Sequence, residues 1–433
     1  MTSALSPEVM PVPHRRWRIA ALLGLGVLIN YFDRINLSVS QSALHAEFDI
    51  STVTFGYLLS AYSWTYALCQ IPVGVLLDRF GVKRVGRVGA LLWSLASFGA
   101  ATAPGIGMFF GARFLLGIGE APTFPANAKA VGYWFPQGER SFATAMFDAA
   151  AKFASAIGVP VIGLLLLRFG WRQSFAMTGL ASLLYFLLFY FIYRNPGEDS
   201  RLSEAERQYI LAGGAQPEAA PTARANGAPL SYLLRQRKVI GLTLGFTAYN
   251  YTFYLLLTWM PSYLATALGI DLLHSVIYAS LPWLIATVTD LAIGGVMVDK
   301  LTQRGWNASS VRRFVLVVGM IFGVGIFGVA GAHSANVAVF WISLSLAGLA
   351  AAAPVAWSIP SLIAPRESVG RIGGIMNFFS QITAIAAPII TGYIVYLTHS
   401  FKGAFLVAAV FLLVGIAGYA FLLGKIEPIP EPE

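Results

Sequence analysis

Twelve apolar stretches of about 20 residues alternate with short polar segments along this 433-residue chain. A run of about 20 apolar residues is long enough to cross a bilayer as an α-helix, and a helix satisfies its own backbone hydrogen bonds there. The pattern therefore predicts an all-α membrane protein with twelve transmembrane helices. The expected spans are residues 18–40, 54–77, 85–103, 106–134, 141–166, 171–193, 238–264, 273–298, 312–332, 335–363, 371–397 and 401–424.

A longer polar segment between the sixth and seventh spans divides the chain into two groups of six. We expect an N-terminal six-helix bundle over residues 1–194, a cytoplasmic linker over 195–237 and a C-terminal six-helix bundle over 238–433. Within the linker, the segment Ser203–Leu211 begins with a helix-capping serine and acidic first-turn residues. These features predict a short helix.

The two halves repeat in sequence. The loop after the second span reads GVLLDRFGVKR from Gly74, and the loop after the eighth reads GGVMVDKLTQRG from Gly294, 220 positions later. Parallel repeats of this kind predict two bundles related by a pseudo-two-fold axis around a central cavity. Asp78 with Arg79, and Asp299 in the second loop, are candidates for charge pairs that lock one conformation and release in another. The alternative is a solvated basic loop that only sets topology.

Composition and the distribution of charge predict the orientation of the chain in the membrane. Only 11% of the residues are charged, whereas soluble domains average roughly 25%. With the N-terminus in the cytoplasm, three of the 29 Lys and Arg residues lie inside spans and three face outward, which leaves 23 on the cytoplasmic side. Both termini are then cytoplasmic. The net charge of +9 follows from topology, so nucleic-acid binding is not expected.

Other protein classes find little support in the sequence. Four of the five histidines lie in loops or tails and the fifth, His274, lies at the very end of a span, so an intramembrane histidine metal site is not expected. The chain has no G-x-x-x-x-G-K-[ST] loop for ATP-driven pumping. We therefore expect a protein that is not an enzyme and has no cofactor or metal. An exporter of cationic drugs would carry buried acids without buried arginines, and a sensor would more often carry a soluble domain.

Ionisable side chains inside spans are costly in a bilayer, so each is a functional candidate by default. Arg34 and Arg113, at similar depth in spans one and four, are predicted to hold a carboxylate together by forked hydrogen bonds. Asp33 and Glu120 are candidate proton carriers, because a carboxylate beside an arginine can exchange a proton for a substrate anion. The alternative is that these charges form structural ion pairs. The seven in-span ionisable residues are Asp33, Arg34, Arg113, Glu120, Asp148, Lys152 and Asp290.

Four segments carry a resemblance to a known family: Asn30–Ser38, Arg113–Asn127, Trp134–Arg140 and Leu257–Leu264. They resemble the anion:cation symporter family of the major facilitator superfamily, which includes bacterial galactonate, glucarate and hexuronate transporters and the animal sialic-acid and vesicular glutamate transporters. The resemblance covers nearly the whole chain. It implies a monomeric carrier of the bacterial inner membrane that imports a small organic anion, such as a sugar acid, by alternating access with protons as the coupling ion.

The resemblance also implies roles for individual residues. In the family, the acids that match Asp33 and Glu120 are proton sites, and the arginines that match Arg34 and Arg113 contact substrate. Tyr31 matches a position that lines the cavity and donates hydrogen bonds to substrate. Tyr66 matches another such position. Further candidates for substrate binding are Asn250 and Tyr254 of span seven and Asn377 and Gln381 of span eleven. Each of these side chains has packing between helices as its alternative role.

Span five departs from the family pattern. Sugar-acid members usually carry neutral polar residues in its middle, whereas this chain has Asp148 and Lys152, which are four residues apart and share a helix face. Span eight adds Asp290 at a similar depth. We predict that Lys152 either bridges to Asp290 as a gate or supplies an extra positive charge for a dicarboxylate or an aromatic acid. The alternative is a neutralised Asp148–Lys152 pair within one helix.

Overall fold

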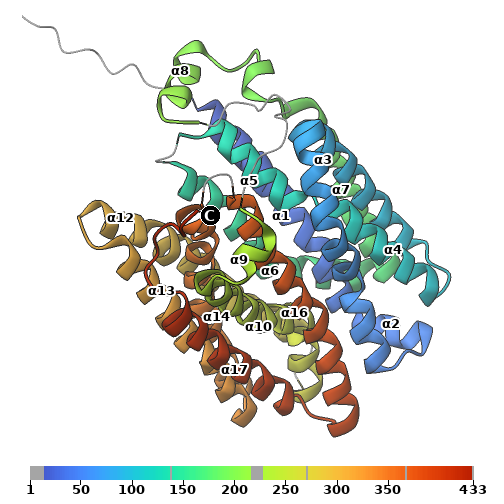
Figure 1. The fold of residues 1–433 in the computed structure, drawn as a ribbon. Coiled ribbons are helices and arrows are strands. Elements are labelled where there is room, and N and C mark those ends of the chain that lie inside the picture. The colour runs from blue at the N-terminus through green and yellow to red at the C-terminus, as the bar shows by residue number, and fades with distance from the viewer. Residues whose placement is uncertain (1–13, 137–138, 216–227, 270–271, 366–367, 432–433) are drawn as a thin grey trace, which may run out of the picture.

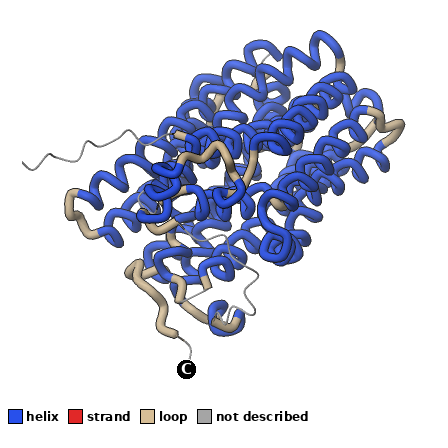
Figure 2. The backbone as a smooth tube through the Cα atoms, turned by 90° about the horizontal axis from the view of Figure 1, so that it is seen from above, coloured by secondary structure: helices blue, strands red, loops and turns tan. Residues whose placement is uncertain are grey.

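The computed structural model describes residues 14–136, 139–215, 228–269, 272–365 and 368–431. Every regular element in these ranges is helical, as the backbone tube of Figure 2 shows. Eight helices in the described part are long and apolar enough to cross a membrane. Four more spans come from α3, which joins two helices, from the broken pair α4 and α5, and from α10. The predicted all-α fold with twelve transmembrane helices is confirmed.

The N-terminal half comprises α1 to α7, which Figure 1 draws in blue to green. The helix α3 contains spans two and three, joined at Gly81, where φ is 75°. Glycine adopts this left-handed backbone without a Cβ clash, so the chain can turn there between two helices. The bounds are α1 Arg15–Val39, α2 Gln41–Phe48, α3 Thr52–Ala101, α4 Ile106–Glu120, α5 Thr123–Trp134, α6 Arg140–Phe169 and α7 Trp171–Ile192.

The linker contains the short helix that its sequence predicts. The Ser203 hydroxyl accepts a hydrogen bond from the Glu206 amide at 3.2 Å, which caps α8. Asp199 and Glu206 reach back to the first turn of α1 and pair with Arg15 and Arg16. The linker elements are η2 Pro196–Glu198, α8 Glu204–Ala212 and α9 Leu230–Leu234.

The C-terminal half, drawn in olive to red, lies on the other side of the molecule in Figure 1. Its span eight changes from an α-helix to a π-helix at Asp290, and its span nine ends in a 3₁₀ segment. The bounds are α10 Arg237–Ala267, α11 Leu272–Thr289, η3 Asp290–Met297, α12 Val298–Gln303, α13 Ala308–Gly323, η4 Val324–Gly331, α14 Ala335–Ser358, α15 Pro360–Ile363, α16 Val369–Thr398, α17 Lys402–Ala417 and η5 Gly418–Leu422.

The helix bundle has two ends, the linker side and the far side. The linker side is the end at which α1 and α10 begin, and α8 marks it in Figure 1. The segment after the last helix also lies there, because the Lys238 amine donates to the Glu427 carbonyl at 3.0 Å. The far side is the end at which α1 and α10 finish. Since α1 and α10 start at the same end, the two halves run in parallel.

Contacts between the halves reveal the pseudo-two-fold axis. The Arg34 guanidinium donates to the Tyr254 hydroxyl at 3.3 Å, and the Ser38 hydroxyl donates to the Thr258 carbonyl at 2.5 Å. Each pair is separated by 220 positions, which is the spacing of the sequence repeat. A residue contacts its own symmetry equivalent only beside the axis. The helices α1 and α10 therefore meet at the centre of the molecule.

Candidate functional site

Arg34 is the centre of a buried polar cluster between the two halves. Its Nη2 lies 2.7 Å from Glu120 Oε2, and its Nε donates to the same oxygen at 2.8 Å. Nη2 also donates to Asn30 Oδ1 at 3.0 Å, four residues earlier on α1. Through Nη1 it reaches the Tyr254 hydroxyl of α10 at 3.3 Å. Because Arg34 and Glu120 are both buried, this ion pair is protected from water and lipid.

Tyrosine rings surround the guanidinium. The Arg34 Cζ lies 4.6 Å from the centre of the Tyr31 ring, 4.8 Å from that of Tyr62 and 5.6 Å from that of Tyr66. Such distances allow cation–π attraction. The Arg113 Cζ lies 5.2 Å from the centre of the Tyr62 ring. The two arginines that the sequence singles out therefore lie together around one tyrosine.

Asp33 and Arg113 are arranged differently from the Arg34–Glu120 pair. The Asp33 carboxylate accepts hydrogen bonds from Ser97 at 2.7 Å and Ser182 at 2.9 Å. It thus points into the N-terminal half, between α3 and α7. Arg113 Nη1 donates to the Asp33 backbone carbonyl at 3.3 Å, while its Nε is buried without a hydrogen-bond partner. The Asp33 carboxylate is therefore held by hydroxyl groups, and Arg113 has donor capacity to spare.

A second charged cluster joins α6 of the N-terminal half to η3 of the C-terminal half. Lys152 Nζ lies 2.5 Å from Asp148 Oδ2 and 2.6 Å from Asp290 Oδ2. All three side chains are buried. The predicted bridge between the halves and the predicted pair within α6 are both present in this arrangement. Whether this cluster gates the carrier or contacts substrate stays a prediction.

The three amide side chains predicted to bind substrate form hydrogen bonds with residues of the helices. Asn250 donates to the Ser380 carbonyl at 2.6 Å, which ties α10 to α16 within the C-terminal half. Asn377 donates to Gln70 Oε1 of α3 at 3.1 Å, which links the two halves. Gln381 donates weakly to Asn377 at 3.5 Å, and its own Oε1 is buried without a hydrogen-bond partner. Roles in substrate binding stay a prediction for all three.

Some contributors were not singled out from the sequence. Tyr62 donates to the Tyr254 hydroxyl at 2.7 Å and lies beside both arginines. Its position four residues before Tyr66, on the same face of span two, is the signal that points to it. Asn30 and Gln70 are further contributors, and the repeat of Asn30 at the equivalent place in span seven is the available signal for it.

The two motif loops, after spans two and eight, add no described charge pair to the site. The side chains of Asp78 and Asp299 lie outside the described part of the structure, so their predicted charge pairs are not placed. Arg79 is exposed, and its Cζ lies 5.3 Å from the ring centre of the neighbouring Phe80. Among the described residues, no group of three or more His, Cys, Asp or Glu side chains is arranged to hold a metal ion.

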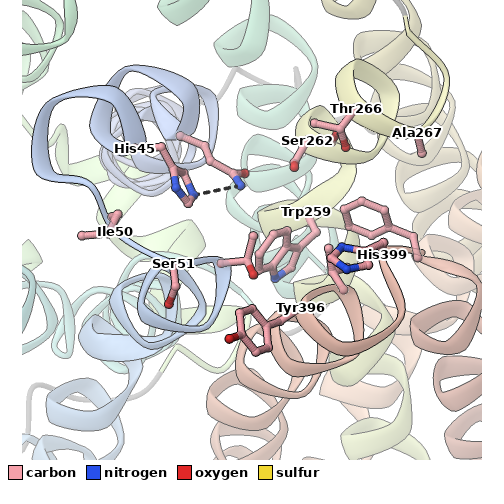
Figure 3. A pocket seen from close by; sticks show the side chains of 13 residues that line it. His45, Ile50, Ser51, Trp259, Ser262, Thr266, Ala267, Tyr396 and His399 are labelled. Atoms are coloured by element: carbon pink, nitrogen blue, oxygen red, sulfur yellow. Dashed lines mark hydrogen bonds between the residues drawn. The ribbon is translucent and has the colours of Figure 1, made fainter.

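A pocket of about 470 Å³ opens at the far side (Figure 3). Both halves line it, with His45 and Ser51 from one half and Trp259 and His399 from the other. Gln41 and His45 approach each other at 3.5 Å. Burial lowers the pKa of His45 below its ordinary value of 6.5, which favours a neutral imidazole. The pocket therefore places polar and aromatic side chains at the far-side end of the interface between the halves.

Comparison with known proteins finds relatives that cover nearly the whole chain. Residues 23–388 match the family profile described as Major Facilitator Superfamily. The transporter YybO of Bacillus subtilis is 40% identical over 418 residues, which cover 96% of each chain. The probable galactarate/D-glucarate transporter GarP of Escherichia coli is 33% identical over 428 residues, again 96% of each chain. A crystal structure of a D-xylose–proton symporter superposes with a TM-score of 0.74 at 16% identity, over 95% of this chain and 98% of that one.

Proposed function

Because this chain belongs to the major facilitator superfamily, a superfamily of transporters, we propose that it is a proton-coupled symporter that imports a small organic anion of the sugar-acid class. Several relatives are named as transporters of such acids, among them galactarate, glucarate and galactonate. These substrates combine carboxylates with hydroxyl groups. A site for them needs cationic side chains for the carboxylates and hydroxyl or amide groups for the remainder.

The observation that carries the proposal is the buried Arg34–Glu120 pair, with an Nη2–Oε2 distance of 2.7 Å at the interface of the halves. A substrate carboxylate competes with Glu120 for the guanidinium fork. When substrate takes the guanidinium, Glu120 loses its cationic partner in a buried place and binds a proton. When substrate leaves, the ion pair re-forms and the proton departs. The anion and the proton thus move together.

Arg113 and the surrounding tyrosines complete this site. The unpartnered Nε of Arg113 can donate to the second carboxylate oxygen or to a second carboxylate. Tyr31, Tyr62 and Tyr66 restrict the space beside Arg34 and present ring faces and hydroxyl groups. Lys152 is already paired with two carboxylates, which makes it less suited to hold a free dicarboxylate or aromatic acid.

Contacts at the far side support alternating access. The Tyr57 and Tyr393 hydroxyls lie 3.5 Å apart, and Ser38 contacts Thr258 nearby. The halves thus meet at the far side, as expected for a carrier that is closed there. We assign the linker side to the cytoplasm of a bacterial inner membrane, because the basic residues gather in the loops of that side. Both termini are then cytoplasmic.

Uptake into proteoliposomes tests the proposal. An inward proton gradient should drive accumulation of radiolabelled D-glucarate. Glu120→Gln should abolish this accumulation but retain exchange of internal for external glucarate, because glutamine mimics the protonated acid and leaves Arg34 free. Glu47→Gln is the control, since Glu47 pairs with Arg172 outside the interface at 2.6 Å. Proton-driven accumulation by the Glu120→Gln variant would overturn the role of Glu120.

A further inference from the structure

The cluster of Asp148, Lys152 and Asp290 holds more acid than base. One ammonium nitrogen contacts both carboxylates, at 2.5 and 2.6 Å, and the exposed fractions of the three residues are 7%, 2% and 0%. With both acids ionised, the cluster would carry a net charge of −1 away from water. Asp290 is ion-paired with Lys152, and its side chain also contacts that of Asp148, which is another acid and brings no positive charge. The negative charge is therefore incompletely compensated.

Groups on the neighbouring helices do not supply the missing positive charge. Tyr31 of α1 and Tyr249 of α10 are the titratable side chains that face the cluster from those helices, and neither is a cation. The helix α14 packs against η3, and its sequence from Ala335 to Ser358 contains no charged residue. Arg34 of α1 is also a buried cation, but it is already ion-paired with Glu120 and so does not neutralise the cluster.

The pseudo-two-fold axis provides an internal comparison. Asp290 and Gln70 are 220 positions apart, which is the repeat spacing, so Gln70 of α3 occupies the equivalent place in the other half. Gln70 contacts Asn377 of α16 at 3.1 Å, just as Asp290 contacts Lys152 of α6. Two neutral amides thus join the halves at one interface, and three ionisable groups join them at the other. The contact between the halves does not itself require charge.

We propose that Asp148, Lys152 and Asp290 form a further proton-binding site, which holds one proton on its carboxyl pair while the halves are in contact there. Two carboxylates that share a buried site do not both ionise. With one proton bound, the two acids and the ammonium sum to zero charge. Lys152 occupies the space between the two carboxylates, so a metal cation is not the expected occupant.

The site acts in the transport cycle through the separation of the halves. When α6 and η3 part, the protonated carboxyl is hydrated and loses the proton to the solution on the open side. When they close and the carrier opens on the opposite side, the cluster takes one proton from the solution on that side. The π-helical backbone that begins at Asp290 fits such a role, since π-helical turns are frequent at functional sites. The cluster then carries one proton per cycle in addition to that of Glu120. This coupling role rests on the proposed symport, whereas the bound proton does not.

Infrared spectroscopy of the purified protein in lipid counts protonated carboxyl groups without any substrate. Asp290→Asn and Asp148→Asn should each lower the carbonyl-stretch signal of protonated acids by one group, because the remaining acid pairs with Lys152. Lys152→Met should raise it by one group, because both acids are then protonated. Gln70→Ala is the matched control at the equivalent interface and should leave the signal unchanged. An unchanged signal in Asp290→Asn, Asp148→Asn and Lys152→Met would overturn the proposal.

A transport measurement separates the coupling role from proton binding. The pH difference that balances a glucarate gradient at zero membrane potential gives the number of protons moved per anion. Asp290→Asn should move one proton fewer than the wild type. An equal number in both would overturn the coupling role. If the wild type moves no glucarate, the proposed substrate class fails, while the infrared count still decides whether the cluster holds a proton.

Discussion

The guanidinium of Arg34 makes a set of contacts that an ammonium group cannot reproduce. Its planar fork reaches Glu120, Asn30 and Tyr254 in different directions at once. Arg34→Lys keeps the charge but loses the fork. A hydrogen bond to a charged group contributes roughly 1.5–3 kcal/mol, and about 1.4 kcal/mol is a factor of ten in affinity. We therefore expect the glucarate concentration that gives half-maximal uptake to rise by about 10- to 100-fold in this variant.

The control for this variant is Arg201→Lys, because Arg201 is exposed in the linker. The Arg201→Lys variant should leave the half-saturating glucarate concentration unchanged. A thermal-shift titration with glucarate reports binding independently of transport, since a ligand that binds the native state stabilises it. Arg34→Lys with wild-type affinity in both assays would show that the fork does not hold the substrate.

Single residues were predictable from the sequence where the chemistry was unusual. A charge within an apolar span stands out, so the sequence alone identifies Arg34, Glu120, Lys152 and Asp290 as candidates. The pairing was harder to predict, because Asp33 and Arg34 are adjacent in α1 yet contact partners on different helices, Ser97 of α3 and Glu120 of α4. Neutral residues such as Tyr62 are common in spans, so the sequence offers only a weak signal for Tyr62, its spacing of four residues from Tyr66.

At the scale of elements, the start of α1 depends on acidic residues distant in sequence. Arg16 donates to Glu139 at 2.7 Å and pairs with Glu206 at 3.0 Å, while the Tyr209 hydroxyl also donates to Glu139 at 2.7 Å. Burial raises the pKa of Glu139, but hydrogen bonds from Arg16 and Tyr209 lower it further, to below the ordinary value of 4.5. The folded state thus favours the ionised carboxylate.

A lowered pKa has a definite consequence for stability against pH. The contribution of Glu139 is complete above about pH 4.5 and is lost as the pH falls through the lower folded-state value. The Glu139→Gln variant should therefore melt at a lower temperature than the wild type at neutral pH. Its free energy of unfolding should be lower by about 1 kcal/mol or less, because this ion pair is partly exposed. The difference should shrink below about pH 4.5.

Melting curves in detergent across this pH range provide the measurement. Glu204→Gln is the control, because Glu204 is exposed and lies 3.5 Å from Arg207 in the same helix. It should change the melting temperature little at any pH. A deficit of Glu139→Gln that stays constant into acid would rule out ionisation of Glu139 as its cause.

Most elements could be predicted from the pattern of apolar residues and caps, whereas their interruptions could not. The Ser203 cap located α8 almost to the residue. The predicted span over 106–134 is instead two helices, which separate at Ala121–Pro122 directly after Glu120. Proline disfavours a continuous helix, but several other prolines lie inside helices, such as Pro160 in α6. Packing against neighbouring helices decides which proline breaks a span, and the local sequence does not contain that information.

At the scale of the whole molecule, the repeat predicted how the halves relate but not how they touch. The spacing of 220 appears in both the motif loops and the contacts of α1 with α10. Other contacts between the halves, such as Gln70 with Asn377, join positions that no sequence repeat relates. Under the proposed alternating access, these contacts differ between the conformations of the carrier. The sequence pattern is the same for all of them, so it does not select one set of contacts.

The far-side contact of α3 with α16 yields a prediction about closure. A Cβ at Gly56 would lie 2.8 Å from the Pro388 carbonyl oxygen, and one at Gly392 would lie 2.9 Å from the Thr52 carbonyl oxygen. Backbone therefore packs directly on backbone, without room for a side chain. Gly56→Val should hold the far side apart and lower glucarate uptake at least tenfold, because the cycle cannot pass through the closed state.

Cross-linking reports the closure itself. In a Cys69→Ser background, which removes the single native cysteine, Tyr57→Cys and Tyr393→Cys place thiols where the two ring centres lie 6.4 Å apart. A short bifunctional thiol reagent should join them efficiently, and adding Gly56→Val should suppress the product. Gly111→Val is the matched control, since a Cβ there meets no atom within 4 Å. Undiminished cross-linking in the Gly56→Val protein would mean that closure tolerates the side chain, and the loss of uptake would then need another cause.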